Sequence, residues 1–462
     1  MTEPATTDAD STSLSPQLET ATAPPIALPA SIAEASKDSA DFFPHAVATL
    51  RAAGLGPHLV ESLALKSIYH CGASRGRDIA TQLALPFAVV EPLLFEMKLA
   101  QLVVLKAGAP AGDYVYELTE RGRAQASQES SHSSYCGAAP VELADYTASV
   151  QRQSVKKQKP RLADVRRALA DLVLSDEQCC SIGEAMNSGI GFFLSGAAGN
   201  GKTSVAERVT SVYGRGLWIP RAILAGGEII RLFDPSCHEE LPFDLETAGF
   251  EPHQLDRRWV YILRPTIIAG GEMTLDQLEP RFNVATGVLE APLTLKANGG
   301  TLVIDDFGRQ KFRPEELFNR LVLPMERQID NLSLPSGRTF QVPFDQLTVF
   351  STNFDPVQLV EEAFLRRIPY KIDIGNPTEE QFREVFGRVA KALGIICDRT
   401  QIDYLLETAF TSAGRPMRFC HPRDLLLQVY NFCTFRELPL LLTREAIDAA
   451  VRNYFVEAPN DR

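Results

Sequence analysis

One segment of the chain has the residue types and the spacing of a phosphate-binding loop. Residues 196–203 read Gly-Ala-Ala-Gly-Asn-Gly-Lys-Thr, which fits the pattern G-x-x-x-x-G-K-S/T. The apolar run over 190–194 predicts a buried strand before the loop, and the spacing over 204–212 predicts a helix after it. A glycine-rich turn between a strand and a helix directs several backbone N–H groups at one point, beside the positive end of the helix dipole. The segment therefore predicts a site for a nucleoside triphosphate.

Two side chains of this loop are expected to contact the triphosphate and its metal ion, in addition to the backbone N–H groups. Lys202 is expected to reach the β- and γ-phosphates, and the Thr203 hydroxyl is expected to ligate Mg²⁺. We therefore expect ATP and Mg²⁺ as the bound ligands. The residues predicted to hold the nucleotide are Gly196, Ala197, Ala198, Gly199, Asn200, Gly201, Lys202, Thr203 and Ser204.

An acidic pair follows a second apolar run. Residues 301–304 read Thr-Leu-Val-Ile and are followed by Asp305 and Asp306. A strand buried in a parallel sheet is continuously apolar, and its carboxyl end faces the crevice where ligands bind. Many strands end in Asp, but beside a phosphate-binding loop the pattern indicates a specific pair of roles. Asp305 would hold Mg²⁺ through water, and Asp306 would orient or deprotonate the attacking water.

Polar residues further along the chain complete the candidate site. Asn353 ends another apolar run and would lie between the two phosphate-binding strands, where it would help to position the lytic water. Arg366 and Arg367 stand together at the end of a helical segment. A planar guanidinium suits the charge of a transferred phosphoryl group and can come from a neighbouring subunit. The sequence does not choose between the two arginines. Arg423 opens the third of four helices predicted near the end of the chain.

Taken together, these motifs resemble those of the AAA+ ATPases. The resemblance covers about 161–455 and places Walker A, Walker B, sensor 1, arginine finger and sensor 2 in family order. It implies Asn353 as sensor 1, Arg423 as sensor 2, and Arg366 or Arg367 as the finger that completes a neighbour's site. It also implies a homo-oligomer, in the form of a hexameric ring with ATP between subunits.

The segments 287–292 and 297–306 are similar to the side of the superfamily that holds MoxR-type chaperones and enhancer-binding activators. The activators' G-A-F-T-G-A loop is missing, and 268–273 reads Ile-Ala-Gly-Gly-Glu-Met in the corresponding region. This segment is either a loop that grips a substrate or a turn after a strand. A second departure is Asp306, where the family usually has Glu. We expect hydrolysis to persist with the shorter acid, at a lower rate.

The predicted fold class is α/β, with a P-loop parallel sheet, a helical lid after it and a winged-helix domain before it. Ala, Ser, Thr and Pro dominate the first 42 residues, which predicts a disordered tail. The predicted divisions are a tail over 1–42, a winged helix-turn-helix-like domain over 43–126, a linker over 127–160, the nucleotide-binding domain over 161–376 and the lid over 377–462. The lid helices are expected over 379–393, 401–410, 423–432 and 444–455.

The winged-helix prediction rests on three helical segments followed by two short strands. These are expected over 59–69, 77–83, 87–99, 102–105 and 114–118, with a turn over 106–113. The helix that would read DNA carries Glu91 and Glu96 against only Lys98, which is unfavourable in a phosphate-lined groove. Basic residues flank it instead, at Arg75, Arg77, Arg121 and Arg123. The pattern favours protein contact or self-assembly over DNA binding, while DNA contact through this domain stays open.

The length, net charge and cysteine content of the chain limit the classes of protein to which it can belong. The 462 residues suffice for two or three domains, and a net charge of −12 argues against nucleic-acid binding by overall field. The eight cysteines include no C-x-x-C pair, which predicts reduced packing residues in a cytoplasmic protein. No apolar run is long enough to span a bilayer, and no signal peptide is expected.

Three functions remain open from the sequence. The first is a chaperone-like ATPase that remodels an unidentified protein or nucleoprotein target. The second is a DNA-associated regulator whose assembly is switched by ATP. The third is a nucleotide-bound scaffold with little turnover.

Overall fold

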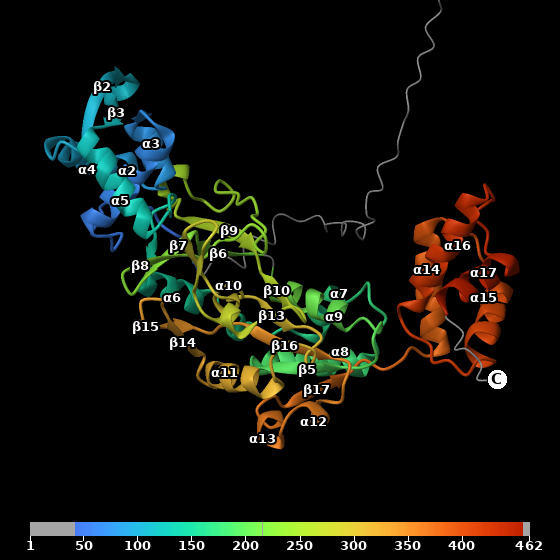
Figure 1. Ribbon diagram of the computed structural model, residues 1–462. Helices are drawn as coiled ribbons and strands as arrows, with labels where there is room; N and C mark the ends of the chain where they lie inside the picture. The colour runs from blue at the N-terminus through green and yellow to red at the C-terminus, as the bar shows by residue number, and fades with distance from the viewer. Residues whose placement is uncertain (1–41, 215, 456–462) are drawn as a thin grey trace, which may run out of the picture.

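The computed structural model describes residues 42–214 and 216–455 (Figure 1). The disordered tail expected over 1–42 lies outside the described residues, apart from Phe42. Phe42 packs on Trp259, with ring centroids 5.2 Å apart.

A five-stranded, fully parallel sheet forms the centre of the nucleotide-binding region. Its order is β10-β13-β16-β5-β17. The strands are β5 (Gly191–Ser195), β10 (Thr266–Ala269), β13 (Thr301–Ile304), β16 (Leu347–Thr352) and β17 (Tyr370–Asp373). As the sequence predicted, β16 lies between the strand before the phosphate-binding loop and the strand before the acidic pair. All the residues of β13 and β16 are buried, including the polar residues Thr348, Ser351 and Thr352 of β16.

Helices cover both faces of this sheet. Leu194 packs on one face with Val205 of α9 and Ile182 of α8, whereas Phe193 packs on the other with Phe318 of α11. Successive strand residues point to opposite faces, so both neighbours in β5 must be apolar. The helices of this region are α7 (Leu162–Ala168), α8 (Asp176–Ser188), α9 (Lys202–Val209), α10 (Leu293–Lys296), α11 (Pro314–Arg327), α12 (Pro356–Leu359) and α13 (Glu362–Leu365).

A second sheet, which the sequence did not predict, takes four of its strands from between α9 and β13 and its edge strand β4 from before α7; it is called the inserted sheet below. Its order is β11-β12-β8-β7-β4. The strands are β4 (Val141–Glu142), β7 (Ala222–Ala225), β8 (Glu228–Arg231), β11 (Arg281–Asn283) and β12 (Val288–Glu290). Two antiparallel pairs accompany it, β6 (Gly216–Pro220) with β9 (Trp259–Leu263) and β14 (Ile329–Ser333) with β15 (Thr339–Pro343).

The linker expected over 127–160 differs in the structure. The helix α5 (Glu120–His132) continues into this interval, and β4 and α6 (Leu143–Arg152) follow it. Val141 and Tyr146 are buried, and β4 pairs with β7 of the inserted sheet. The Ser-rich stretch before residue 135 concealed these short elements, whose apolar residues are too few to show a period.

The N-terminal region has an apolar core that also includes Ala222 and Val288 of the inserted sheet. Its elements are α2 (Pro57–Cys71), β1 (Ser74–Arg75), α3 (Gly76–Gln82), α4 (Phe87–Leu99), β2 (Val103–Ala109) and β3 (Asp113–Leu118). The three strands pair antiparallel in the order β1-β3-β2. The turn expected over 106–113 is shorter, because β2 continues to Ala109 and only Pro110–Gly112 forms the turn.

Four helices end the described chain and gather at one end of the molecule (Figure 1). They are α14 (Glu379–Leu393), α15 (Arg399–Leu406), α16 (His421–Phe435) and α17 (Arg444–Tyr454). The boundaries of α14 match the prediction, and α16 begins two residues earlier and ends three later than expected. Side chains from all four helices share one apolar core.

A buried histidine in this bundle should make its stability depend on pH. His421 packs against the rings of Phe410 and Phe455 and accepts a hydrogen bond at Nδ1 from the Arg418 N–H, at 3.1 Å. Burial lowers the pKa of His421 to about 4. The unfolded state therefore takes up the proton first, so stability present above pH 6.5 is lost as the pH falls toward 4. We expect the melting temperature to fall less over this range in His421→Asn than in the wild type, and equal slopes would contradict this.

Across residues 42–214 and 216–455, no single helix has the length and apolarity needed to cross a membrane, and only the bent pair α3 and α4 meets that test when joined.

Candidate functional site

The phosphate-binding loop lies at the carboxyl edge of the parallel sheet, between β5 and α9. Lys202 is buried, and its Nζ donates to Gly196 O at 2.9 Å, Ala197 O at 3.1 Å and Asn353 Oδ1 at 2.7 Å. Burial lowers the pKa of Lys202, and the nearby carboxylates of Asp305 and Asp306 oppose that shift. The ammonium group therefore sits where the loop, the acidic pair and the end of β16 meet.

Thr203 and Asp305 form the part of the site that could hold a metal ion. The Thr203 hydroxyl donates to Asp305 Oδ2 at 2.8 Å. An adjacent hydroxyl and carboxylate are oxygen ligands of the kind Mg²⁺ takes, together with water and phosphate oxygens. Within the described residues no group of three or more His, Cys, Asp or Glu could hold a metal by itself. The site thus fits Mg²⁺ bound jointly with a nucleotide.

Asp306 is held in an unusual backbone conformation. Its φ is +49°, in the left-handed region where Asp and Asn are enriched among residues other than glycine. Its N–H donates to Asp305 Oδ1 at 3.0 Å, and its Oδ1 accepts from Asn353 Nδ2 at 3.0 Å. Asn353 therefore joins Lys202 to Asp306 with its two amide atoms, which fixes the distance between them.

Lengthening this acid should disturb the arrangement. Asp306→Glu adds a methylene to a side chain whose carboxylate is held by a hydrogen bond from Asn353. It also puts Glu, which adopts the left-handed region less readily than Asp, at a position with positive φ. We expect a loss of about 1 kcal/mol in stability. Phosphate release should slow by about tenfold, equivalent to about 1.4 kcal/mol in the barrier. Denaturant titration and a phosphate assay would measure these effects, and a faster variant would show instead that the short acid limits turnover.

The loop is braced against the end of β17. Asn200 Nδ2 donates to Ile374 O at 3.2 Å, Gly375 O at 3.1 Å and Asn376 Oδ1 at 2.9 Å. At Gly196 the φ is +140°, and a Cβ atom there would lie 2.4 Å from Ile374 O. Glycine is therefore required at this position both by conformation and by space.

A cavity of about 450 Å³ opens over the loop. Its volume is in the range of small-molecule sites. One wall is apolar, with Leu172, Val173, Leu174 and Val385. The other lining residues include Ala198, Gly199, Asn200, Gly201, Lys202, Thr203, Ser204, Asp305, Asp306, Asn353, Phe419, Cys420 and Arg423. The cavity therefore combines an apolar wall with the predicted phosphate and metal ligands.

The segment just before α16 contributes two residues that the sequence reasoning missed. Arg418 donates from Nη1 to Ala198 O at 2.7 Å, and Cys420 lies so close to Gly199 that a Cβ there would be 2.5 Å from its Sγ. Arg423 also lines the cavity, but its exposed side chain pairs with Asp424 at 3.4 Å. Arg418 precedes the helix start, and only its fold-dependent contact with the loop distinguishes it from other surface arginines.

The two candidate finger residues lie outside this cavity and differ in their contacts. Arg367 pairs with Glu326, with Nε 2.5 Å from Oε1, and donates to Ala363 O at 3.2 Å. Arg366 is exposed, its backbone N–H donates to Glu362 O at 3.1 Å, and its guanidinium has no polar partner within the described part of the chain. Of the pair, Arg366 is the guanidinium available for another molecule.

The segment 268–273 is anchored by Ala269 and Met273, which are buried, whereas Ile268 is exposed. Ile268 and Ala269 end β10, Met273 is fully buried, and Glu272 accepts a hydrogen bond from the Gly270 N–H at 3.2 Å. These contacts favour the alternative of a turn after a strand over that of a loop that grips a substrate.

Comparison with known proteins gives one family match and several structural likenesses. The family described as "Domain of unknown function (DUF8689)" matches residues 378–453, the four-helix segment. No curated protein matches the chain. The structure of NtrX from Brucella abortus in complex with ADP is similar with a TM-score of 0.39 and 13% identity, over 65% of this chain and 60% of that one. This chain thus spans about three fifths of the NtrX length.

The Thermotoga maritima RuvB Holliday junction branch migration motor is similar with a TM-score of 0.37 and 12% identity, over 64% of this chain and 74% of that one. Both TM-scores lie below 0.5, so these likenesses carry no conclusion about function.

Proposed function

We propose that the protein is a Mg²⁺-dependent ATPase of the AAA+ type. The observation that carries this proposal is the convergence of Lys202, the Thr203–Asp305 pair and the Asn353–Asp306 pair at one edge of a parallel sheet. These groups match the parts that phosphoryl transfer to water requires, namely a phosphate cradle, a metal position and a base that orients water.

Each residue has a role that follows from its position. Backbone N–H groups of the loop and Lys202 bind the β- and γ-phosphates and balance their charge. Thr203 and Asp305 hold Mg²⁺, which when bound neutralises charge on the β/γ oxygens. Asp306 orients the attacking water and accepts its proton, and Asn353 keeps Asp306 at a fixed distance from Lys202. The apolar wall around Val173 receives the base of the nucleotide.

A ring of identical subunits would complete the site. The finger residue is absent from the cavity of its own chain, and Arg366 is unpaired within the described residues. We propose that Arg366 enters the site of a neighbouring copy in a hexamer. The Arg418–Ala198 contact supports a lid role for the four C-terminal helices. A nucleotide that displaces the loop at Ala198 would also displace Arg418 and the helix that follows it.

The energy of hydrolysis would remodel a protein or nucleoprotein target in the cytoplasm. The N-terminal elements have the order of a winged helix, and the exposed face of α4 carries Glu91, Phe95 and Glu96. Carboxylates beside an aromatic ring favour a protein contact over a DNA groove. Capture of partners by Asp306→Asn with ATP bound, compared with Lys202→Ala, tests this part. The remodelling role would be contradicted if Asp306→Asn enriched no partner over Lys202→Ala.

The ATPase proposal is tested by phosphate release with ATP in the presence and absence of Mg²⁺. We expect release only with Mg²⁺, and a loss of at least about 10²-fold in Thr203→Ala, where the hydroxyl of the metal pair is missing. Thr81→Ala is a matched control, since it removes an exposed threonine hydroxyl in α3 that donates to Arg77 O and lies outside the cavity over the loop. Equal rates in the wild type and Thr203→Ala would overturn the proposal.

A further inference from the structure

A second pocket, of about 390 Å³, lies in the inserted region beside β11, β12 and α10. Its lining shares no residue with the nucleotide cavity. Polar side chains dominate it, and the residues that matter here are Gln277, Glu279, Arg281, Phe282, Asn283, Glu290 and Lys296. None of them has a role in the proposed ATPase.

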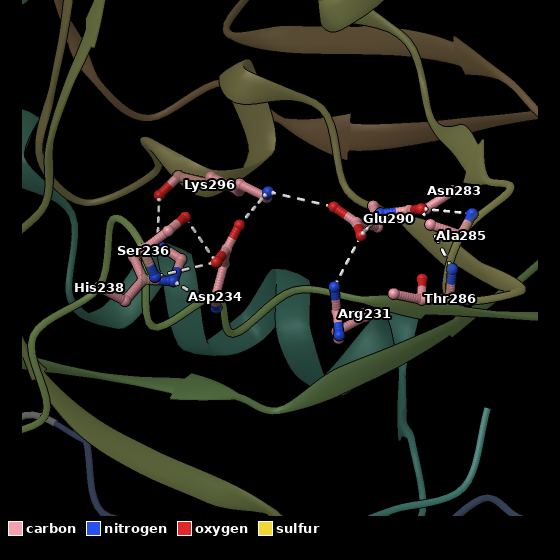
Figure 2. Close-up of polar contacts among 9 residues, drawn as sticks. All are labelled: Arg231, Asp234, Ser236, His238, Asn283, Ala285, Thr286, Glu290 and Lys296. Atoms are coloured by element: carbon pink, nitrogen blue, oxygen red, sulfur yellow. Dashed lines mark hydrogen bonds and ion pairs between the residues drawn. The ribbon is translucent and has the colours of Figure 1, made fainter.

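One wall of the pocket is a partly buried ionic network (Figure 2). Lys296 is only 9% exposed, and its Nζ lies 2.7 Å from Asp234 Oδ2 and 3.8 Å from Glu290 Oε2. On the side of Glu290 away from Lys296, Oε1 accepts from Arg231 at 2.6 Å and from Asn283 Nδ2 at 2.8 Å. Both oxygens of Glu290 are thus occupied by cations and an amide of the same chain.

The other carboxylate of the pocket is occupied in the same way. Glu279 Oε1 accepts from Arg320 Nε at 2.9 Å, and its Oε2 accepts from the Ser333 N–H at 3.0 Å. His238, behind the wall, accepts at Nδ1 from the Asp234 N–H at 3.1 Å, so its Nε2 carries the proton and donates to Lys296 O at 3.0 Å. The wall therefore presents no unused carboxylate oxygen or ring nitrogen to a ligand.

Unused donors, by contrast, remain. Arg281 is exposed, lines the pocket and has no polar partner within the described part of the chain. One N–H of Asn283 and the amide NH₂ of Gln277 make no hydrogen bond among the described residues, although both side chains accept bonds through oxygen. Phe282, 48% exposed, adds an aromatic surface. A ligand complementary to these free donors and to the exposed ring has hydrogen-bond acceptors and an apolar group.

We propose that this pocket binds a carboxylate that is attached to an apolar group, with the carboxylate on the Arg281 guanidinium and the apolar group on Phe282. The planar fork of arginine matches a carboxylate in a bidentate geometry. The carboxylate could belong to a free small acid or to an acidic side chain of a peptide.

The experiment is a titration of the full-length protein without nucleotide, so its outcome does not depend on the ATPase proposal. The probes are N-acetyl-leucine, its uncharged amide, and the peptides Ac-Ala-Glu-Leu-Ala-NH₂ and Ac-Ala-Gln-Leu-Ala-NH₂, followed by calorimetry or NMR. Binding of at least one acid that is about tenfold tighter than its amide counterpart is expected. Binding of the free acid identifies a small-molecule ligand, and binding of the peptide alone identifies a peptide ligand.

Substitutions of Arg281 test whether the acid binds in this pocket. Arg281→Gln should weaken binding by about tenfold, and Arg281→Lys should restore part of it, because a charge without the fork remains. Arg121→Gln, an exposed arginine on α5, is the matched control and should bind like the wild type. The proposal is overturned if neither acid binds, if amides bind equally well, or if Arg281→Gln binds unchanged while its melting temperature equals that of the wild type.

Discussion

Arg366→Ala is expected to reduce ATP hydrolysis by the assembled protein by about 10³-fold, the effect of removing an arginine finger. The side chain is exposed, lies outside the cavity of its own chain and has no polar partner within the described residues. A guanidinium supplied by a neighbour stabilises charge that develops only in the transition state, so nucleotide affinity should change little. Phosphate release and nucleotide titration, both at a concentration where the wild type is assembled, measure the two effects.

Arg367→Ala is the matched control, because Arg367 is already paired with Glu326 in its own chain. A surface pair of this kind contributes at most about 1 kcal/mol, and hydrolysis should stay within about threefold of the wild type. A mixing experiment separates a finger from a local defect. Arg366→Ala subunits mixed with Lys202→Ala subunits should regain activity, since each kind supplies what the other lacks. No recovery, or a larger loss in Arg367→Ala, would contradict the assignment.

Arg258→Ala is expected to lower the free energy of unfolding by about 3–5 kcal/mol, the usual effect of breaking a buried ion pair. Arg258 is 2% exposed and donates from Nε and Nη2 to Asp256, with the shortest contact 2.7 Å. Its Nη1 also donates to Ala53 O at 3.4 Å and Pro140 O at 3.1 Å. One guanidinium thus ties the N-terminal core to the start of β4.

Denaturant titration measures this change. The double variant Arg258→Met with Asp256→Leu is the control, because it removes both charges and keeps apolar volume. It should be clearly more stable than Arg258→Ala. If Arg258→Ala unfolds at the denaturant concentration of the wild type, the pair does not stabilise the connection between the two regions.

The sequence predicted the centre of the fold because its signals are local. The strands β5 and β13 are short, mainly apolar runs that end in a loop or a polar residue, and each such run can be identified without its neighbours. The boundaries of α4 and α14 were predicted to the residue. Pro86 before α4 and the Thr378 cap of α14 mark these helix starts in the sequence.

The inserted sheet could not be predicted in the same way. Its strands are two to four residues long, and β4 pairs with β7, whose residues lie 82 positions further along the chain, as in Val141 with Ile223. Strands this short show neither alternation nor a sustained apolar run, so only long-range pairing defines them. Arg418 and Cys420 were missed for a related reason, because their contact with the phosphate-binding loop exists only after the lid has folded against it.

The central claim is that the loop over 196–203 and the pair Asp305–Asp306 form a site that hydrolyses ATP. The most direct measurement combines nucleotide affinity with phosphate release for the wild type, Lys202→Ala and Asp306→Asn. The wild type should bind ATP and release phosphate, Asp306→Asn should bind but release at least about 10²-fold more slowly, and Lys202→Ala should show weakened binding and no release. Three proteins that release phosphate at the same rate, or none of which releases it, would contradict the claim and leave a nucleotide-bound scaffold.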